Sequence, residues 1–203
     1  MSERKTIQFS IANDRDLDAV IDLHMNSMSA LLTDLGRSFV RRYYEVALAD
    51  PASILMCARD LSGEIVGWAM ASPDPRGLSN QMSFPRAWFV AQIAKLVMCR
   101  PGVFMQLVRS VVISQRDMQL PERSIELVYI GVSALARGKG VGGGLLAAIL
   151  RVSSERGFSK LLLSVEVENQ SAVALYRACG FDIESTYVEG RYHRHRMSKQ
   201  LSA

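Results

Sequence analysis

The stretch VYIGVSALARGKGVGGGLLAAIL, residues 128–150, decides the fold, because a glycine-rich turn in it joins an apolar strand-like run to an apolar helix. Five of the fourteen glycines in the chain lie between positions 138 and 144. After this turn, Val141, Leu145 and Ile149 recur on one helix face. Glycine within a helix costs roughly 0.5–1 kcal/mol relative to alanine. The cluster indicates either a tightly packed helix start or, as we favour, backbone N–H groups that bind an anion there.

The pattern of the glycines narrows the class of anion. A P-loop is excluded, because neither Gly138 nor Gly143 is followed by the Lys and Ser/Thr pair of that motif. Gly138, Gly140 and Gly143 do match the GxGxxG of dinucleotide-binding domains. In those domains the motif directly follows the first strand, whereas here three predicted strands precede the one that leads into it, and residues 133–136 intervene. A dinucleotide is therefore the second choice of cofactor.

A short helix is predicted over residues 170–179, with Asn169 as its N-cap and Gly180 just beyond its end. Helical spacing places Asn169 and Tyr176 on one edge and turns Leu175 towards the core. A tyrosine at that edge is either a packing residue or a general acid. Its place beside the glycine-rich turn favours the second interpretation.

These segments resemble the central motifs of the GNAT superfamily of acetyl-CoA-dependent N-acetyltransferases. The resemblance covers residues 125–181, and both motifs stand in the family's order and spacing. One departure is Ala134, where many members of the family carry proline. The matching residues are Ile130-Gly131-Val132, the RGKGVG turn at 137–142, and Leu163, Val165, Asn169, Ala172, Leu175, Tyr176, Gly180 and Phe181.

The resemblance implies acetyl-CoA as the acetyl donor and assigns roles to individual residues. Main-chain groups of Ile130 and Val132 would bind the pantetheine arm and the acetyl carbonyl, and Gly131 would form a bulge that splays this strand from the next. Asn169 would contact the cofactor, and Tyr176 would protonate the departing thiolate. The pyrophosphate would lie on the amides of Arg137, Gly138, Lys139, Gly140, Val141 and Gly142.

The implied reaction needs a neutral amine, so a base is expected near the acetyl group. Glu126 is the candidate, because some family members place a base at this point of the strand. Strict alternation puts Glu126 on the same face as Ile130 and Val132. A solvated carboxylate at a strand end is the alternative. The candidates on the acceptor side are Tyr129, Tyr187, Tyr192 and His193.

Strands and helices are mixed along the whole chain, with both hairpins and crossovers, which predicts an α/β fold with a mixed, mostly antiparallel sheet of about six to seven strands. Residues 1–203 are expected to form a single domain with a helical insertion at 73–124 between the third and fourth strands. Within it, 73–84 reads as a loop. Strands are predicted at 5–12, 53–59, 64–72, 125–132 and 159–166, with a final hairpin at 181–199. Helices are predicted from residue 14, after Gly36, and at 85–100, 101–116, 140–156 and 170–179.

Basic residues concentrate outside the cofactor motifs. The formal net charge is +4, which is too small to suggest a nucleic-acid partner. Residues 75–116 hold six basic side chains and no acidic one, and residues 190–199 hold four more without an acid. The insertion is either a helical pair packed on the sheet, a site for an anionic acceptor, or a surface that docks weakly on a membrane. The terminal charges either select the acceptor or protect an exposed edge strand.

Three widely spaced cysteines predict neither a disulfide framework nor a metal site. We expect neither a signal peptide nor a membrane-spanning segment, so a cytoplasmic location is the default expectation. The favoured function is acetyl transfer to a primary amine, with the acceptor left open between an anionic small molecule, such as an amino sugar derivative, and a protein amine. A non-catalytic acyl-CoA-binding module is the second hypothesis and a dinucleotide-binding protein the third. A monomer or a homodimer fits equally well.

Overall fold

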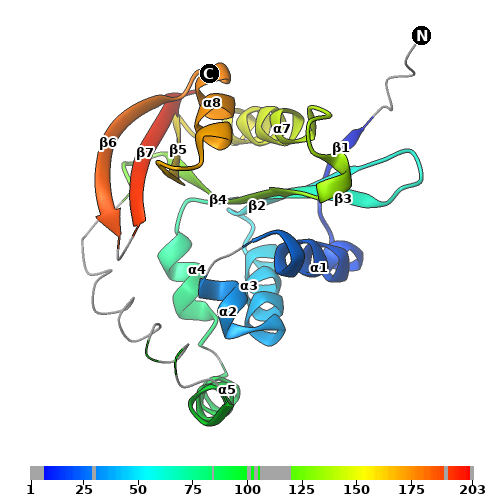
Figure 1. Ribbon diagram of the computed structural model, residues 1–203, viewed down its shortest axis with the longest axis vertical. Coiled ribbons are helices and arrows are strands. Elements are labelled where there is room, and N and C mark those ends of the chain that lie inside the picture. Colours follow the sequence, from blue (N-terminus) through cyan, green and yellow to red (C-terminus); the bar gives the residue numbers. More distant parts are fainter. Residues whose placement is uncertain are drawn as a thin grey trace.

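A computed structural model describes residues 7–28, 31–83, 85–99, 102, 105, 120–189 and 192–201. Its centre is a seven-stranded sheet in the order β1-β2-β3-β4-β5-β7-β6 (Figure 1). Only β4 and β5 run parallel; every other neighbouring pair is antiparallel. The strands are β1 (Gln8–Ile11), β2 (Ile54–Arg59), β3 (Ile65–Ser72), β4 (Ser124–Val132), β5 (Lys160–Glu166), β6 (Asp182–Glu189) and β7 (Tyr192–Gln200).

Helices cover both faces of the sheet (Figure 1). One face packs against α7 (Val141–Glu155) and α8 (Gln170–Ala178). The opposite face packs against α1 (Leu17–Ser27) and α3 (Arg37–Ala49), which join α2 (Leu31–Leu35), α4 (Pro75–Gln81) and α5 (Arg86–Cys99). Because both faces are covered, β2 is buried along nearly its whole length and reads ILMCAR without alternation.

The predicted α/β class and the mixed, mostly antiparallel sheet are confirmed. The hairpin of β2 and β3 and the helix after Gly36 form where the periodicity predicts them. The expectation of a loop over residues 73–84 is wrong, because α4 forms there. Asp74 caps α4 through an acceptor bond from the amide of Gly77 (2.8 Å), and Pro75 takes the first helical position, where its missing N–H costs nothing.

The helical insertion is described in part. Its predicted first helix, residues 85–100, is confirmed as α5. The predicted second helix at 101–116 lies outside the described residues, apart from 102 and 105. None of the helices in the described part of the chain is both long enough and apolar enough to cross a membrane.

Candidate functional site

The sheet opens between β4 and β5. Their parallel pairing begins at Ser124 and Lys160 and stops at Leu127 and Leu163. Beyond that point β4 remains paired with β3 up to Val132, and β5 remains paired with β7 up to Glu166. The two strands therefore diverge while each is held by its outer neighbour. The peptide groups of β4 that face β5 in this stretch are not paired with β5.

A bulge in β4 changes which side chains share a face. Tyr129 pairs with Met70 and Leu127 pairs with Ala71, so Val128 is the extra residue. Leu127, Ile130 and Val132 all lie on the α7 face, whereas Tyr129 lies on the α1 face. The expectation that Glu126 shares a face with Ile130 and Val132 is therefore wrong. Glu126, next to Leu127, points to the α1 face.

The bulge also corrects the role expected for Gly131. The extra residue is Val128, and Gly131 pairs regularly with Trp68. A Cβ atom at Gly131 would lie 2.3 Å from two carbons of the Trp68 indole ring. Glycine is needed at this position because the ring of Trp68 covers it.

The glycine-rich turn leads directly into α7. Gly138 and Gly140 have φ of +73° and +80°, a region that side chains with a Cβ rarely adopt. Gly140 is the N-cap, and its carbonyl accepts the first helical bond from Gly144 (3.0 Å). The amides of Val141, Gly142 and Gly143 precede that bond, so they are free of intrahelical partners. This start of α7 has the backbone donors and the dipole that an anion requires.

The three glycines in the first turn of α7, at positions 142 to 144, have two different explanations. A Cβ at Gly144 would lie 2.1 Å from the ring of Phe9, so packing explains that glycine. A Cβ atom at Gly142 would lie 3.5 Å from Leu175 and 3.8 Å from Val132, and one at Gly143 would lie 3.7 Å from Leu175, which are all ordinary contact distances. Packing therefore does not require glycine at these two positions. Their bare backbone fits a bound group that must approach closely.

Two basic side chains flank this turn. Arg137 donates through Nε to the carbonyl of Val132 (3.3 Å), and Lys139 donates through Nζ to the carbonyl of Leu135 (2.5 Å). Both side chains are exposed. A pyrophosphate at the start of α7 would therefore meet two nearby cations as well as the amides.

Asn169 and Tyr176 lie on α8 as predicted, but they face different surroundings. Asn169 is exposed and caps the helix, with its Oδ1 accepting from the amide of Ala172 (3.2 Å). Tyr176 is only 6% exposed and packs on Phe181, with ring centroids 5.9 Å apart. Burial raises the pKa of Tyr176 to about 12, which keeps its phenol neutral. Of Leu175 and Tyr176, it is Tyr176 that points into the core. Leu175 is half-buried and lies against Gly142 and Gly143, so the predicted orientations of these two side chains are reversed.

On the α1 face, Glu126 forms an ion pair that the sequence did not predict. Both nitrogens at the end of the Arg196 side chain contact the Glu126 carboxylate, and Arg196 is almost fully buried. Arg196 also donates to Oγ of Ser164 (3.1 Å), which accepts from Oη of Tyr187 as well (3.0 Å). The side chains of Glu126, Arg196, Ser164 and Tyr187 form one polar network on the α1 face of the sheet, near the point where the pairing of β4 with β5 ends. Seventy positions separate Glu126 from Arg196, so only the sheet order shows that they meet.

The predicted acceptor-side residues divide between the two faces. Tyr129 lies on the α1 face, and burial raises its pKa to about 12. Tyr187 joins it there through the polar network. Along β7, Tyr192 alternates with Arg194 and Arg196 on that face, whereas His193 shares the other face with Met197. The structure therefore brings Tyr129, Tyr187 and Tyr192 to Glu126's face and separates His193 from them.

A second buried network lies under β4 and was also missed by the sequence analysis. Nε1 of Trp68 donates to Oη of Tyr44 (2.7 Å), and that hydroxyl lies 2.8 Å from Nδ1 of His24. His24 is fully buried, and burial lowers its pKa to about 4. Its ring meets the edge of Tyr129 at 5.0 Å. No spacing rule links these residues, because they come from α1, α3, β3 and β4.

The terminal basic segment does not form an exposed edge. β7 lies between β5 and β6, so the hypothesis of an edge strand protected by charge is wrong. Arg194 forms ion pairs with Glu166 and Glu189 at 3.8 and 2.9 Å, and Arg196 pairs with Glu126. Residues 190–191 lie outside the described residues. The charges of β7 are therefore largely balanced within the fold.

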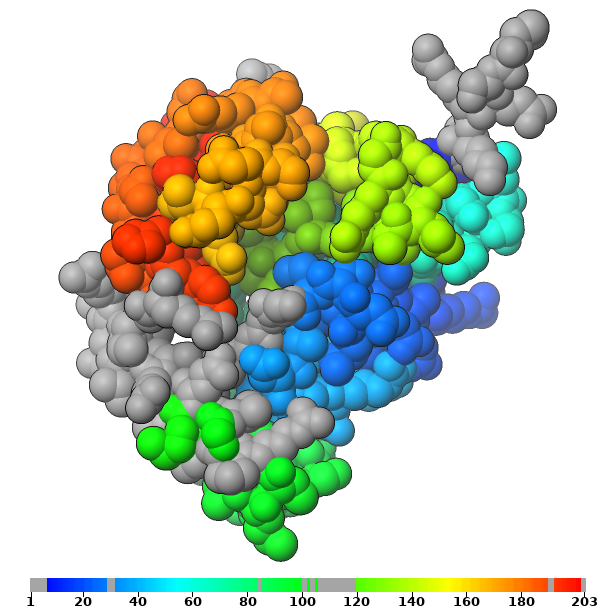
Figure 2. Space-filling view, in the orientation of Figure 1, coloured from blue at the N-terminus to red at the C-terminus, as the bar shows by residue number. Residues whose placement is uncertain are grey.

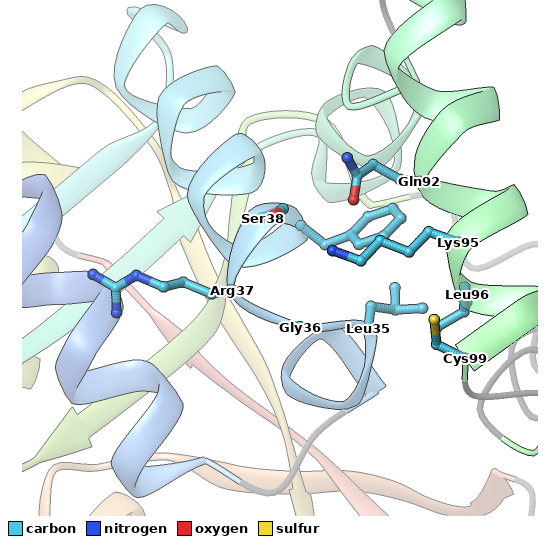
Figure 3. Close-up of a pocket in the computed structure, with 9 residues that line it drawn as sticks. Leu35, Gly36, Arg37, Ser38, Gln92, Lys95, Leu96 and Cys99 are labelled. Atoms are coloured by element: carbon cyan, nitrogen blue, oxygen red, sulfur yellow. The ribbon is translucent and has the colours of Figure 1, made fainter.

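A hollow of about 180 Å³ lies away from the β4–β5 opening, between α3 and α5 (Figure 3). Lys95 extends across it towards Ser38, whereas Arg37 points away towards α1, where it pairs with Asp22. The hollow faces neither α7 nor α8. Its residues are Leu35, Gly36, Arg37, Ser38, Phe39, Gln92, Lys95, Leu96 and Cys99.

Comparison with known proteins agrees with this arrangement. Residues 17–181 match the family model described as the acetyltransferase (GNAT) family. The chain is 31% identical over 74 residues to a probable N-acetyltransferase family 8 member 5 of Mus musculus, covering 36% of this chain and 33% of that protein. It is 38% identical over 68 residues to a mycothiol acetyltransferase of Amycolatopsis mediterranei, covering 34% and 23%. The matches thus span a third or less of these curated relatives.

Solved structures share the fold over nearly the whole chain. A GCN5-related N-acetyltransferase from Kribbella flavida superposes with a TM-score of 0.65 at 20% identity, covering 96% of this chain and 98% of that one. The ribosomal-protein-S18-alanine N-acetyltransferase of Escherichia coli gives 0.62 at 14% identity, covering 98% and 96%. At such identities the likeness concerns the fold.

Proposed function

Because this chain belongs to the GNAT acetyltransferase family, we propose that it transfers an acetyl group from acetyl-CoA to a primary amine by direct attack in a ternary complex. The observation that carries the proposal is the opening between β4 and β5. The bare glycine backbone of α7 lies on one face of it, and the network of Glu126 lies on the other. A donor and an acceptor can therefore reach the same gap from opposite faces.

The α7 face fits the donor. The amides at the start of α7, with Arg137 and Lys139 beside them, suit the pyrophosphate of coenzyme A. Main-chain groups of Ile130 and Val132 are proposed to hold the pantetheine arm along β4, where pairing with β5 has ended. Asn169, at the start of α8, is proposed to contact the same molecule. Bound acetyl-CoA would supply an acetyl group activated as a thioester.

The α1 face fits the acceptor. We assign Glu126 the role of accepting the proton that the attacking amine loses, and Tyr129 and Tyr187 the role of lining the approach. Arg196 fixes the position of the Glu126 carboxylate beside the opening through two contacts. Tyr176 would donate its phenolic proton to the sulfur as the carbon–sulfur bond breaks. The hydroxyl would regain a proton from solvent.

A small-molecule amine is proposed as the acceptor, with a protein amine as the alternative. The names of one relative and one solved structure refer to different molecules, mycothiol and the alanine of a ribosomal protein, so these names do not single out one acceptor class. The ion pairs of Arg194 and Arg196 with glutamates reduce the case for an anionic acceptor at β7. The acceptor screen therefore needs neutral, cationic and anionic amines in equal measure.

The test is a screen of amines with acetyl-CoA, read by release of free thiol. It should include amino sugars and their phosphates, amino acids, polyamines and peptides with free N-termini. Turnover that requires one amine class, with an acetylated product of the correct mass, supports the proposal. Tight coenzyme A binding without turnover for any amine would instead support a non-catalytic acyl-CoA-binding module.

A dinucleotide-binding protein is disfavoured by the fold. Such domains bind their ligand on a mostly parallel sheet, whereas this sheet has a single parallel pair. Thermal stabilisation by coenzyme A but not by NAD(H) is the expected outcome, and the reverse would overturn the cofactor assignment.

A further inference from the structure

Val132 ends β4, and its peptide groups face the β4–β5 opening. The next amide, that of Ser133, donates to the carbonyl of Val66 on β3 (2.8 Å). Residues of an antiparallel ladder alternately bond the neighbouring strand and point away from it. Val132, which lies opposite Gly67, therefore directs its carbonyl away from β3, towards the side from which β5 has diverged.

This end of β4 is within reach of solvent. Ile130, Gly131 and Val132 are each half-buried, although β4 lies inside the sheet. Figure 2 shows green atoms of β4 between the yellow-green atoms of the turn into α7 and the orange atoms of α8. A ligand that lies along β4 can therefore approach the Val132 carbonyl from this side.

The side chain of Arg137 occupies this carbonyl. A 3-10 turn, η2 (Ala134–Ala136), follows β4, and the side chain of Arg137 after it reaches back to Val132. Its Nε donates to the Val132 oxygen (3.3 Å). Because Arg137 is exposed, its guanidinium can leave this position without opening the core. The bond thus covers one hydrogen-bond acceptor of the opening in a way that a ligand can reverse.

Lys139, two residues further on, differs from Arg137 in one respect. It is exposed and cationic as well, and its Nζ also donates to a carbonyl, that of Leu135 (2.5 Å). Leu135, however, lies in η2, beyond the end of β4. Of these two cations beside the start of α7, Arg137 is therefore the one that occupies a peptide group of β4.

We propose that Arg137 selects coenzyme A thioesters against shorter pantetheine thioesters. The pantetheine arm must take the place of the Arg137 Nε at the Val132 carbonyl, which costs the hydrogen bond between them. A phosphate at the start of α7 offsets this cost, because the displaced guanidinium can pair with it. A thioester without a phosphate has no such compensation. This inference rests on the proposed function, since it takes Val132 as a contact of the pantetheine arm.

A phosphate-free ligand distinguishes this role from simple phosphate binding. An arginine that only bound phosphate would raise the affinity for coenzyme A and leave the affinity for pantetheine unchanged. The bond to Val132 adds a second effect of opposite sign, because removal of the guanidinium opens the carbonyl to the pantetheine arm. Loss of Arg137 should therefore weaken the binding of coenzyme A and strengthen the binding of pantetheine.

The test is calorimetric titration of the native protein, R137M and K139M with coenzyme A, 4′-phosphopantetheine and pantetheine, the weaker ligands by displacement of coenzyme A. R137M should bind pantetheine about threefold more tightly than the native protein does. Its preference for 4′-phosphopantetheine over pantetheine should fall about tenfold, since it also loses the phosphate contact. K139M removes the same charge at the neighbouring exposed position and is the matched control. It should bind coenzyme A more weakly and pantetheine with native affinity.

Two results would overturn the inference while leaving the proposed function intact. One is pantetheine binding by R137M that is no tighter than that of the native protein, and the other is an equal gain in K139M. If the native protein does not bind coenzyme A, the assignment of the acetyl donor fails, and this inference fails with it. Because both side chains are exposed, the three proteins should have equal melting temperatures, which excludes unfolding as the cause of a change in affinity.

Discussion

The indole ring of Trp68 lies directly over Gly131, so that a Cβ atom on this glycine would fall 2.3 Å from Cη2 and Cζ3 of the ring. The ring cannot move away easily, because it is fully buried and its Nε1 donates to Oη of Tyr44. Gly131 stands in the part of β4 that no longer pairs with β5. The contact therefore fixes the strand where it would meet the acetyl donor.

The variant G131A tests this contact. Overpacking should lower the free energy of unfolding by about 1–3 kcal/mol. It should also weaken coenzyme A binding, because β4 must shift away from Trp68. Combining G131A with W68F makes room for the added methyl group, so G131A should cost less in the W68F background than in the native one. Equal costs in both backgrounds, measured by chemical denaturation, would refute the assignment.

Two glycines in the first turn of α7 should respond in opposite ways. G144A brings a Cβ atom to 2.1 Å from the ring of Phe9 and should lower the melting temperature. G142A meets Leu175 and Val132 at the ordinary distances of 3.5 and 3.8 Å, so better helix propensity should keep or raise the melting temperature. G142A should nevertheless weaken coenzyme A binding, because a methyl group now stands at the proposed cradle. Calorimetry and thermal melts measure both effects, and a G142A variant with native coenzyme A affinity would contradict the cradle.

Much of the fold could be predicted from the sequence, because apolar periodicity reports burial along each element. The order of strands and helices over residues 125–181 follows directly from it, and so does the α7 stripe of Val141, Leu145 and Ile149. The start of α4 was missed although Asp74-Pro75 is a helix-start signal, because proline and glycine nearby favoured a loop.

The face of the sheet on which each side chain of β4 lies could not be predicted, because a single extra residue at Val128 inverts the alternation of the residues that follow it. Likewise, nothing local links Glu126 with Arg196, which meet only because β5 lies between β4 and β7. The glycines show a similar limit. The sequence alone does not distinguish Gly142 from Gly144, whereas in the structure packing against Phe9 explains only Gly144.

Stability should fall in mild acid because of His24. Its pKa is lowered from 6.5 to about 4 by burial, so the unfolded chain binds a proton between these values while the folded chain does not. The contribution of His24 to the free energy of unfolding is therefore complete above about pH 6.5 and is lost as the pH falls towards 4. A shift of this size corresponds to about 3 kcal/mol.

The variant H24N tests this assignment by denaturation at several pH values. Asparagine retains an acceptor for the hydroxyl of Tyr44 but does not titrate, so the slope between pH 6.5 and 4 should shrink. H193N, which removes a histidine at an exposed position, is the matched control. An unchanged slope in H24N would show that other groups cause the acid sensitivity.

The variant E126Q should lower kcat by about a hundredfold near neutral pH if Glu126 accepts the amine proton. The loss should narrow at high pH, where the amine is already neutral, while coenzyme A affinity stays native. E126Q also leaves the buried Arg196 without its partner, and breaking such a pair typically costs about 3–5 kcal/mol. The double variant E126Q R196Q removes both charges and separates the two effects. If it is stable and fully active across the pH range, Glu126 is not the base.

The variant Y176F should remove the proposed proton donor while keeping its packing. The ring of Tyr176 packs at a tilt against Phe181 within the core, and phenylalanine fills the same space, so the melting temperature should change little. We expect kcat to fall by about a hundredfold or more with little change in KM for acetyl-CoA.

A donor thioester with a more acidic thiol distinguishes proton donation from a loss of positioning. Such a thiolate leaves without help, so Y176F should lose much less activity with it than with acetyl-CoA. A variant that merely misplaces the donor should lose the same factor with both thioesters. Since the pKa of Tyr176 is raised to about 12, its phenol stays protonated through the usual assay range, and the comparison can be made at any pH where the amine is neutral. Unchanged turnover of Y176F with acetyl-CoA would eliminate this tyrosine as the general acid.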